Sequence, residues 1–283
     1  MTVGIIGLGL IGGSMAKAFK THTDFTIYGY DINESSVKAA IKQNVIDGFL
    51  TDALLCNCEL VIVALYPDAV IEYIKRNKNG FKDGAIVIDC CGVKEHVCTP
   101  LFALAENSNF CFYGGHPMAG TQFSGFENSR GNMFDGASMV IVPPPCADTK
   151  VTEFLKQIFT DIGFGCVTLS DAKTHDKIIA YTSQLAHVVS SAYVKSPNAL
   201  IHGGFSAGSF KDLTRVAALN EDMWTELFLE NAKYLSWEID RIADELKKYS
   251  HAIKNGDADT LHKLLEEGTM LKKKSLQEEF REE

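Results

Sequence analysis

The sequence predicts an α/β domain with a doubly wound sheet, followed by an all-α domain. Three observations lead to this prediction: strands alternate with helices over the first 170 residues, a glycine-rich turn joins the first strand to the first helix, and only helical periodicity continues after Ser170. Alternation of strand and helix is typical of a parallel sheet that helices cover on both faces. We therefore expect two domains, residues 1–170 and residues 171–283.

The elements of the first domain are expected at short apolar runs and at the helical stretches between them. Strands are expected at residues 2–7, 25–31, 59–65, 85–89, 110–115, 138–142 and 166–169. Helices are expected at residues 10–20, 34–43, from Pro67 onward, 94–106 and 149–161. The run ELVIVAL at 59–65 is almost continuously apolar, which is typical of a strand buried on both faces of a parallel sheet. Beyond residue 171 we expect helices alone, broken at glycines.

Composition excludes several classes of protein. Hydrophobic residues make up 46% of the 283 residues and charged residues 22%, which is ordinary for a soluble protein. No apolar run approaches the ~18 residues of a membrane span. The net charge of −9 opposes nonspecific nucleic-acid binding, so an anionic substrate needs a local basic pocket. The eight cysteines lack metal-ligand spacing, so we expect reduced thiols, a cytoplasmic protein and no metal.

A dinucleotide-binding motif lies at the start of the chain. Gly7, Gly9 and Gly12 form G-x-G-x-x-G between the first strand and the first helix. In a Rossmann-type domain such glycines allow a tight turn, close approach of a pyrophosphate and close helix packing, and the helix N-terminus attracts the phosphates. The expected cofactor contacts in this turn are Gly7, Leu8, Gly9, Leu10, Ile11 and Gly12. Further contacts are expected at Leu65 and Pro67, where the strand 59–65 ends and the next helix begins.

An acidic residue at the end of the second strand indicates which cofactor binds. Asp31 lies 19 residues beyond Gly12. A carboxylate at this place hydrogen-bonds the adenosine ribose and repels a 2′-phosphate, so NAD is expected rather than NADP. The alternative is that Asp31 only stabilises the turn before Asn33.

His116 is the candidate general base. It lies in GGHPMAG, after an expected strand, so it should sit at the carboxyl edge of the sheet, where ligands of open α/β folds bind. Pro117 restricts the backbone of His116. A histidine of near-neutral pKa can take a proton from a hydroxyl while a hydride leaves the adjacent carbon. The alternative is a structural histidine in a turn.

The residues resemble the prephenate and arogenate dehydrogenase family over nearly the whole chain. The stretch GLGLIGGSMAKAFK is similar to that family's glycine motif, and GGHPMAGTQFSGFENSRGNMFDG is similar to its histidine loop. HDKIIAYTSQLAHVVSSA and GSFKDLTRVAALNEDMW resemble two signatures of its helical domain, in the same order. The resemblance implies NAD-dependent oxidative decarboxylation of prephenate to 4-hydroxyphenylpyruvate in tyrosine biosynthesis. It also implies a homodimer formed through the helical domain.

Two positions depart from the family pattern. The family usually has a serine in a D-x-G-S-x-K motif, where its hydroxyl assists the catalytic histidine, whereas this chain has Gly92 at the serine position. A water or the backbone of this turn must then replace that contact. The helical signature often reads S-H-L-P-H, and here only the second histidine, His187, is present.

The substrate pocket is expected on one helix face and one arginine. At 100° per residue the face carries Asp176, Ala180, Ser183, Gln184, His187 and Ser191. We expect His187 and Gln184 to contact substrate, with Asp176 orienting its neighbours; the alternative is a solvent-facing stripe. Prephenate is a dianion, and the resemblance places Arg215 as its carboxylate clamp, for which a guanidinium fork is suited. Lys94 is expected to add positive potential, and the alternative for Arg215 is a surface arginine.

Two other functions remain open at this point. One is a different two-domain dehydrogenase, of the β-hydroxyacid or pyrroline-carboxylate reductase type, which lacks the histidine loop. The other is an NAD-sensing binding protein without catalysis, which is consistent with Gly92 in place of serine.

Overall fold

The computed structural model describes residues 1–121 and 123–279 and forms two compact units, Met1–Ala232 and Lys233–Glu283. The secondary structure changes from mixed to all-helical after Leu169, as the sequence suggests, but the helices up to Ala232 belong to the first compact unit. The expected domain boundary near residue 170 therefore stays a prediction.

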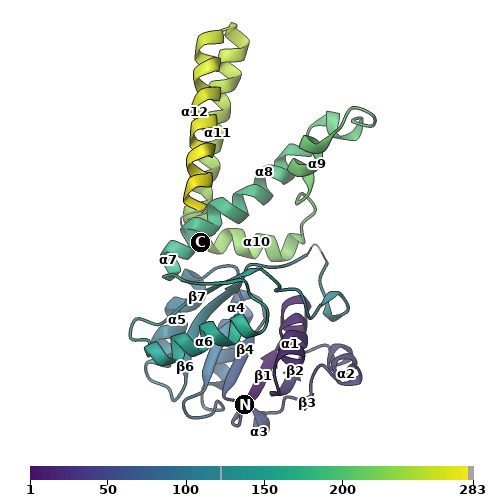
Figure 1. Ribbon diagram of the computed structural model, residues 1–283, viewed down its shortest axis with the longest axis vertical. Helices are drawn as coiled ribbons and strands as arrows, with labels where there is room; N and C mark the ends of the chain where they lie inside the picture. Colours follow the sequence, from purple (N-terminus) through teal and green to yellow (C-terminus); the bar gives the residue numbers. More distant parts are fainter. Residues whose placement is uncertain (122, 280–283) are drawn as a thin grey trace. The chain divides into compact units, whose positions relative to one another are not determined.

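The first unit is built on an eight-stranded sheet in the order β3-β2-β1-β4-β5-β6-β7-β8 (Figure 1). The strands are β1 (Thr2–Ile6), β2 (Thr26–Tyr30), β3 (Gly48–Phe49), β4 (Leu60–Val63), β5 (Ile86–Asp89), β6 (Cys111–Pro117), β7 (Ser138–Val142) and β8 (Cys166–Leu169). Seven of these match the expected strands, and the two-residue β3 was missed because it is too short to show a period. The expectation of a wholly parallel sheet is wrong at one place, because β7 runs antiparallel to β6.

The helices begin where the sequence supplies caps. Asn33, Asp148 and Asp171 accept hydrogen bonds from the first turns of α2, α6 and α7, and Pro67 opens α4. The helices of this unit are α1 (Leu10–His22), α2 (Glu34–Lys42), α3 (Asp52–Leu55), α4 (Pro67–Asn77), α5 (Glu95–Ala105), α6 (Thr149–Asp161), α7 (Ala172–Ile179), α8 (Leu185–Tyr193), α9 (Gly208–Thr214) and α10 (Glu221–Glu230). A π-helical turn, Ala180–Gln184, joins α7 to α8.

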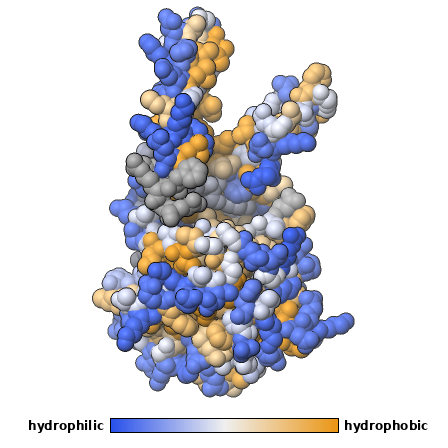
Figure 2. Space-filling model, viewed as in Figure 1, coloured by the Kyte–Doolittle hydropathy of each residue, from blue (hydrophilic) through white to orange (hydrophobic). Residues whose placement is uncertain are grey.

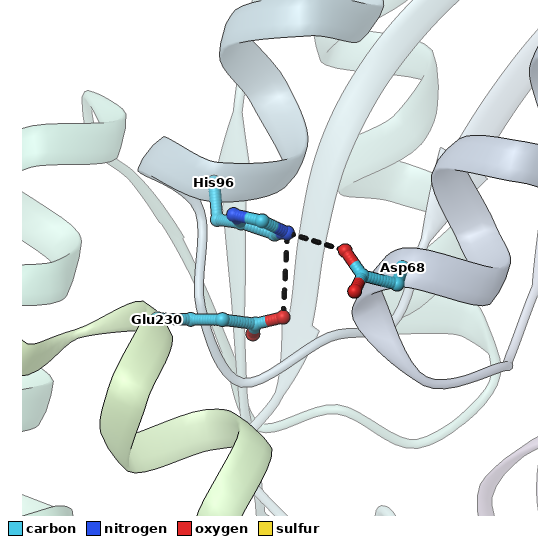
Figure 3. A group of neighbouring side chains, drawn as sticks. All are labelled: Asp68, His96 and Glu230. Atoms are coloured by element: carbon cyan, nitrogen blue, oxygen red, sulfur yellow. Dashed lines mark hydrogen bonds and ion pairs between the residues drawn. The ribbon is translucent and has the colours of Figure 1, made fainter.

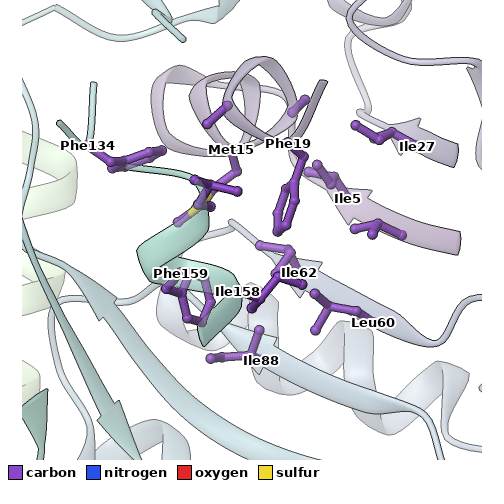
Figure 4. Close-up of a cluster of buried hydrophobic side chains, with 14 of the residues drawn as sticks. Ile5, Met15, Phe19, Ile27, Leu60, Ile62, Ile88, Phe134, Ile158 and Phe159 are labelled. Carbon is purple, nitrogen blue, oxygen red and sulfur yellow. The ribbon is translucent and has the colours of Figure 1, made fainter. Parts of the chain in front are cut away.

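The sheet is buried on both faces, as the run at 59–65 predicts. Leu60 and Ile62 of β4 pack in the cluster that includes α1 and α6, where Phe19 and Phe159 approach the strands (Figure 4). The alternate residues Val61 and Val63 pack on the other face with α4 and α5. Because side chains alternate along a strand, an unbroken apolar run is required here.

The glycine-rich turn has the geometry that its motif requires. Gly7 has φ +86°, and a Cβ on Gly12 would lie 1.8 Å from the Gly7 carbonyl oxygen, so neither position accepts a side chain. A Cβ on Gly9 would meet nothing within 4 Å, which leaves open space directly before α1. The turn therefore presents bare backbone at a helix N-terminus, as a pyrophosphate site needs.

The second unit consists of α11 (Ala232–Asn255), which begins at the unit boundary, and α12 (Ala258–Glu279). The Tyr249 hydroxyl donates to the Leu264 carbonyl at 3.1 Å and links the two helices. Both helices expose apolar side chains (Figure 2), namely Leu246, Ile253, Leu265, Met270, Leu271 and Leu276. None of the helices in the described part of the chain is both long enough and apolar enough to cross a membrane.

Candidate active site

A buried ion pair fixes the strand that carries His116. Lys94 and Asp89 are both fully buried and bonded to each other, and the Lys94 ammonium also donates to the Gly115 carbonyl at 2.6 Å. The Asp89 carboxylate accepts from the Gly115 amide at 3.0 Å. The end of β5 is thereby tied to β6 one residue before His116. Burial alone would lower the pKa of Lys94, but Asp89 and neighbouring thiols raise it to about 12.

This arrangement places the Lys94 charge inside the protein, where it adds to burial and His175 in lowering the pKa of His116, and it corrects the expectation of a direct substrate contact. Its side chain has no exposed surface and its ammonium is already paired, so it is a structural cation. It also explains the two glycines before His116. A Cβ on Gly114 would lie 2.5 Å from the Cys98 sulfur, and one on Gly115 would lie 2.4 Å from the Asp89 carbonyl oxygen.

His116 is the first member of a chain of three polar side chains. Its Nδ1 lies 2.9 Å from His175 Nε2, and His175 Nδ1 lies 2.7 Å from Asp176 Oδ1. His116 sits on β6 and is partly exposed, whereas His175 and Asp176 are buried in α7. The chain therefore runs from the carboxyl edge of the sheet into the protein.

The chain selects the tautomers of both histidines. A carboxylate only accepts, so Nδ1 of His175 carries a proton and its Nε2 is an acceptor when the ring is neutral. Nδ1 of His116 must then donate to that acceptor, which leaves His116 Nε2 with a free lone pair. Burial, followed by His175 and Lys94, holds the pKa of His116 well below its usual value. His116 is therefore a neutral proton acceptor at neutral pH.

Asp176 also joins two helices. Its Oδ1 and Oδ2 accept from the backbone amides of Lys94 and Glu95, each at 2.7 Å, at the N-terminus of α5. With the His175 contact, the carboxylate therefore accepts three hydrogen bonds. Asp176 is placed to orient its neighbours, and the role expected from the sequence stays a prediction.

Gln184 is placed differently from the expectation. It is 2% exposed, its amide nitrogen donates to the Leu227 carbonyl at 3.2 Å, and its oxygen accepts from Asn231 at 2.7 Å. Its role is therefore to pack α10 against the π-helical turn, and the expectation of a substrate contact is corrected. The predicted helix face assumed a constant 100° per residue and did not include the π-helical turn Ala180–Gln184. Gln184, at the inner end of that face, is buried.

Gly92 lies beside the free nitrogen of His116. A Cβ built on Gly92 would be 3.7 Å from His116 Nε2 and 3.8 Å from Leu227 on α10, both ordinary contacts. The turn after β5 thus faces the acceptor side of His116, where the family motif usually has its serine. A side chain fits at this position without displacement of its neighbours.

His187, Arg215 and Trp224 form a second group. The rings of His187 and Trp224 have centroids 4.0 Å apart, and His187 Nδ1 lies 3.2 Å from the Val216 carbonyl oxygen. Burial is the main cause that lowers the pKa of His187, and the Arg215 charge lowers it further. Arg215 follows the last turn of α9, is exposed, and makes no ion pair with any residue that the structure describes.

The expected cofactor residues gather around the first turn of α1. Asp31 accepts from the Leu8 amide and from the Asn33 amide, each at 2.7 Å, so it stabilises the turn and still has free lone pairs. The expectation that Leu8 contacts the cofactor is corrected, because its amide donates to Asp31 and its side chain lies in the core. Leu10 and Ile11 begin α1, Leu65 approaches Gly7, and Pro67 is buried at the start of α4.

Sequence reasoning missed His175 and Asp89. His175 directly precedes Asp176 in the stretch HDKII, and an adjacent His–Asp pair just inside a helix start was the available signal. Asp89 ends a predicted strand five residues before Lys94, which identified a turn but not a buried pair.

Comparisons with known proteins agree along the chain. Residues 15–168 match the family described as prephenate dehydrogenase, nucleotide-binding domain, and residues 171–267 match prephenate dehydrogenase, dimerization domain. A cyclohexadienyl dehydrogenase of Zymomonas mobilis is 31% identical over 92% of this chain and 90% of its own length. A prephenate dehydrogenase of Lactococcus lactis is 29% identical over 95% of this chain and 75% of its own length.

A solved structure extends the likeness to three dimensions. The prephenate dehydrogenase from Aquifex aeolicus in complex with hydroxyphenyl propionate and NAD+ has a TM-score of 0.84 and 29% identity, and covers 97% of this chain and 98% of that one. The α/β Rossmann-type domain and the helical domain after it are confirmed by these matches. The chain therefore belongs to the prephenate and arogenate dehydrogenase family.

Proposed function

We propose that the protein is an NAD-dependent prephenate dehydrogenase, which converts prephenate to 4-hydroxyphenylpyruvate and CO2 in tyrosine biosynthesis. The observation that carries this proposal is the chain from Asp176 through His175 to His116. It leaves an unprotonated Nε2 beside the turn at Gly92, at the edge of the sheet where the cofactor site lies. Alcohol oxidation requires a proton acceptor at this place.

The glycine turn fits NAD. Gly9 leaves open backbone before α1, whose first-turn amides and helix dipole favour a pyrophosphate. Asp31 keeps lone pairs for the ribose hydroxyls and places a negative charge where a 2′-phosphate would sit. NAD supplies the hydride acceptor for C4 of prephenate. NAD is therefore expected to be preferred over NADP.

The protein's own groups act on the proton and on the position of the ring. His116 Nε2 takes the proton of the C4 hydroxyl, and the resulting imidazolium is stabilised through His175 by the Asp176 carboxylate. Loss of the ring carboxylate as CO2 restores aromaticity, so the protein mainly has to position and polarise the substrate.

Arg215 and His187 are proposed to hold the substrate's side-chain carboxylate. Arg215 is unpaired within the described residues, and its planar fork matches a carboxylate. Arogenate carries an ammonium in place of the keto oxygen and needs an acidic partner. The Asp176 carboxylate already accepts three hydrogen bonds, so it is a poor partner for that ammonium. We therefore expect a higher kcat/KM for prephenate than for arogenate.

The assembly is proposed to be a homodimer formed through residues 171–283. The match to a dimerization domain and the exposed apolar side chains of α11 and α12 support this proposal. A cytoplasmic location is part of the same proposal, and the eight free thiols are consistent with it.

Steady-state kinetics with prephenate and arogenate, each with NAD and with NADP, test the proposal. We expect NADH formation with prephenate, weaker turnover of arogenate, and little turnover with NADP. Absence of turnover with any combination, in a protein that still binds NAD, would favour the NAD-sensing alternative. Turnover of β-hydroxyacids alone would favour the other dehydrogenase type.

A further inference from the structure

A second histidine–carboxylate cluster shares no residue with the His116 network and has no part in the proposed chemistry. It consists of Asp68 in the first turn of α4, His96 in the first turn of α5 and Glu230 at the end of α10 (Figure 3). His96 Nε2 lies 2.7 Å from Asp68 Oδ1 and 3.3 Å from Glu230 Oε1. Three helices far apart in sequence therefore bring one ligand atom each to one point.

Two of the three pairs of atoms have the spacing of metal ligands. All lie within 4.8 Å of one another. Ligands about 2.0–2.1 Å from an ion are about 3.0 Å apart on the edge of an octahedron and about 3.4 Å apart on that of a tetrahedron. The His96 distances of 2.7 and 3.3 Å are close to these edges. The Asp68 and Glu230 atoms are bounded only by the 4.8 Å limit, so the exposed Asp68 side chain has to turn toward Glu230 to complete a triangular face around one ion.

Glu230 provides an independent indication of a ligand. Its side chain is 9% exposed, and its Oε2 is buried without a hydrogen-bond partner. A buried carboxylate oxygen without a partner costs free energy, which a cation would recover. The Asp68 and His96 side chains are 73% and 36% exposed, so water can fill the remaining coordination positions. The cluster is therefore buried on the side of Glu230 and open to solvent on the side of Asp68 and His96.

We propose that Asp68, His96 and Glu230 bind a divalent transition-metal ion of the Zn²⁺ class. One imidazole and two carboxylates form a mixed N/O set that suits Zn²⁺ or Co²⁺, whereas Mg²⁺ prefers oxygen ligands alone. Two carboxylate charges neutralise the ion when the histidine is neutral. The bound ion ties the end of α10 to the starts of α4 and α5, so its role is structural. The proposal is independent of the proposed dehydrogenase function.

Co²⁺ titration of the full-length, tag-free protein tests this site. Its visible spectrum reports the geometry of a bound ion, and its near-ultraviolet charge-transfer bands reveal any thiolate ligand from the eight cysteines. We expect one equivalent to bind with N/O ligands and without thiolate bands, and to raise the Tm. His96→Gln, Glu230→Gln and Asp68→Asn should each weaken binding by at least about tenfold.

Matched controls separate this site from surface binding. Glu72 lies on the exposed side of the helix that carries Asp68, and His22 is an exposed histidine elsewhere. The variants Glu72→Gln and His22→Gln should both bind Co²⁺ like the unchanged protein. Asp68 is largely exposed, so its variant should fold even if the Glu230 variant does not. The proposal is overturned if the unchanged protein binds no Co²⁺, if thiolate bands dominate, or if Asp68→Asn and His96→Gln bind as tightly as the controls.

Discussion

Two histidine–carboxylate clusters meet the first turn of α5, and they differ in how fully their polar atoms are used. In the first, the Asp176 carboxylate accepts from two backbone amides and contacts His175, which in turn contacts His116. In the second, His96 contacts two carboxylates, and one buried oxygen of Glu230 has no partner. The same residue types therefore form one network whose buried polar atoms are all paired, which we call saturated, and one that leaves a buried oxygen unpaired, which we call unsaturated.

This difference decides what each cluster can do. A saturated network fixes tautomers and ring orientation, which is what a general base needs before substrate arrives. The unsaturated cluster keeps a buried carboxylate oxygen that a cation or a proton can still bind. Burial also acts in opposite directions: it lowers the pKa of His116 and raises that of Glu230 to about 7.

The largest expected effect separates the two clusters by activity. His116→Asn should lower kcat by ~10²–10⁴ with prephenate affinity nearly unchanged, because a positioned general base is lost. His96→Asn, the matched change in the second cluster, should alter kcat less than about twofold when assayed in EDTA. Steady-state kinetics of both variants make the comparison. A near-normal rate for His116→Asn would move the proton acceptor elsewhere.

Removal of the middle histidine tests whether the chain acts as a unit. His175→Gln should lower kcat by about 10- to 100-fold, because His116 is no longer held in one tautomer. His116 must be neutral to act, so kcat/KM falls as the pH drops through its pKa. In the unchanged enzyme that decline should lie below pH 6.5. It should move to higher pH in the variant, because His175 is, after burial, one of the causes that lower the pKa of His116. An unmoved acid limb would reduce His175 to a packing residue.

The second cluster should show itself in the pH dependence of stability. The pKa of Glu230 is raised from 4.5 to about 7, chiefly by burial, so its contribution is present below pH 4.5 and lost as the pH rises through about 7. In EDTA, Glu230→Gln should therefore gain stability relative to the unchanged protein at about pH 8 compared with about pH 5, by at most about 3 kcal/mol. Thermal unfolding at both pH values measures this difference. A difference independent of pH would mean that Glu230 titrates normally.

The smallest expected effect concerns the turn that faces His116. Gly92→Ser adds a hydroxyl near Nε2, and its Cβ makes only ordinary contacts of 3.7–3.9 Å. We expect kcat/KM to rise a few-fold, about the value of one hydrogen bond, with stability changed by less than about 0.5 kcal/mol. Kinetics and thermal unfolding test both statements, and Gly92→Ala provides the control without a hydroxyl. Equal effects of Ser and Ala would show that the hydroxyl makes no contact.

The fold was largely predictable because local patterns determine it. The alternation of strands and helices, the glycine turn and Pro67 each act within a few residues of sequence. The antiparallel β7 was not predictable, since strand direction depends on pairing across the sheet. The π-helical turn at Ala180–Gln184 was not predicted either, and it changes which residues share the expected helix face.

The candidate site was predictable only in part. His116 lies at the end of β6 and Asp31 directly follows β2, and the ends of strands are where open α/β sheets place their functional residues. The roles of Lys94 and Gln184 depend on partners far along the chain, namely Gly115 and Asn231, and sequence spacing does not reveal such pairs. His175 gains its role from a contact 59 residues away.

The tautomer of His116 tests the central claim most directly. Long-range ¹H–¹⁵N NMR of the histidine side chains, assigned with His116→Asn, distinguishes Nδ1–H, Nε2–H and imidazolium forms in the free protein at about pH 7. The account predicts a neutral His116 protonated at Nδ1, with Nε2 as a bare acceptor, and His175 also protonated at Nδ1. An imidazolium, or a His116 protonated at Nε2, would contradict it.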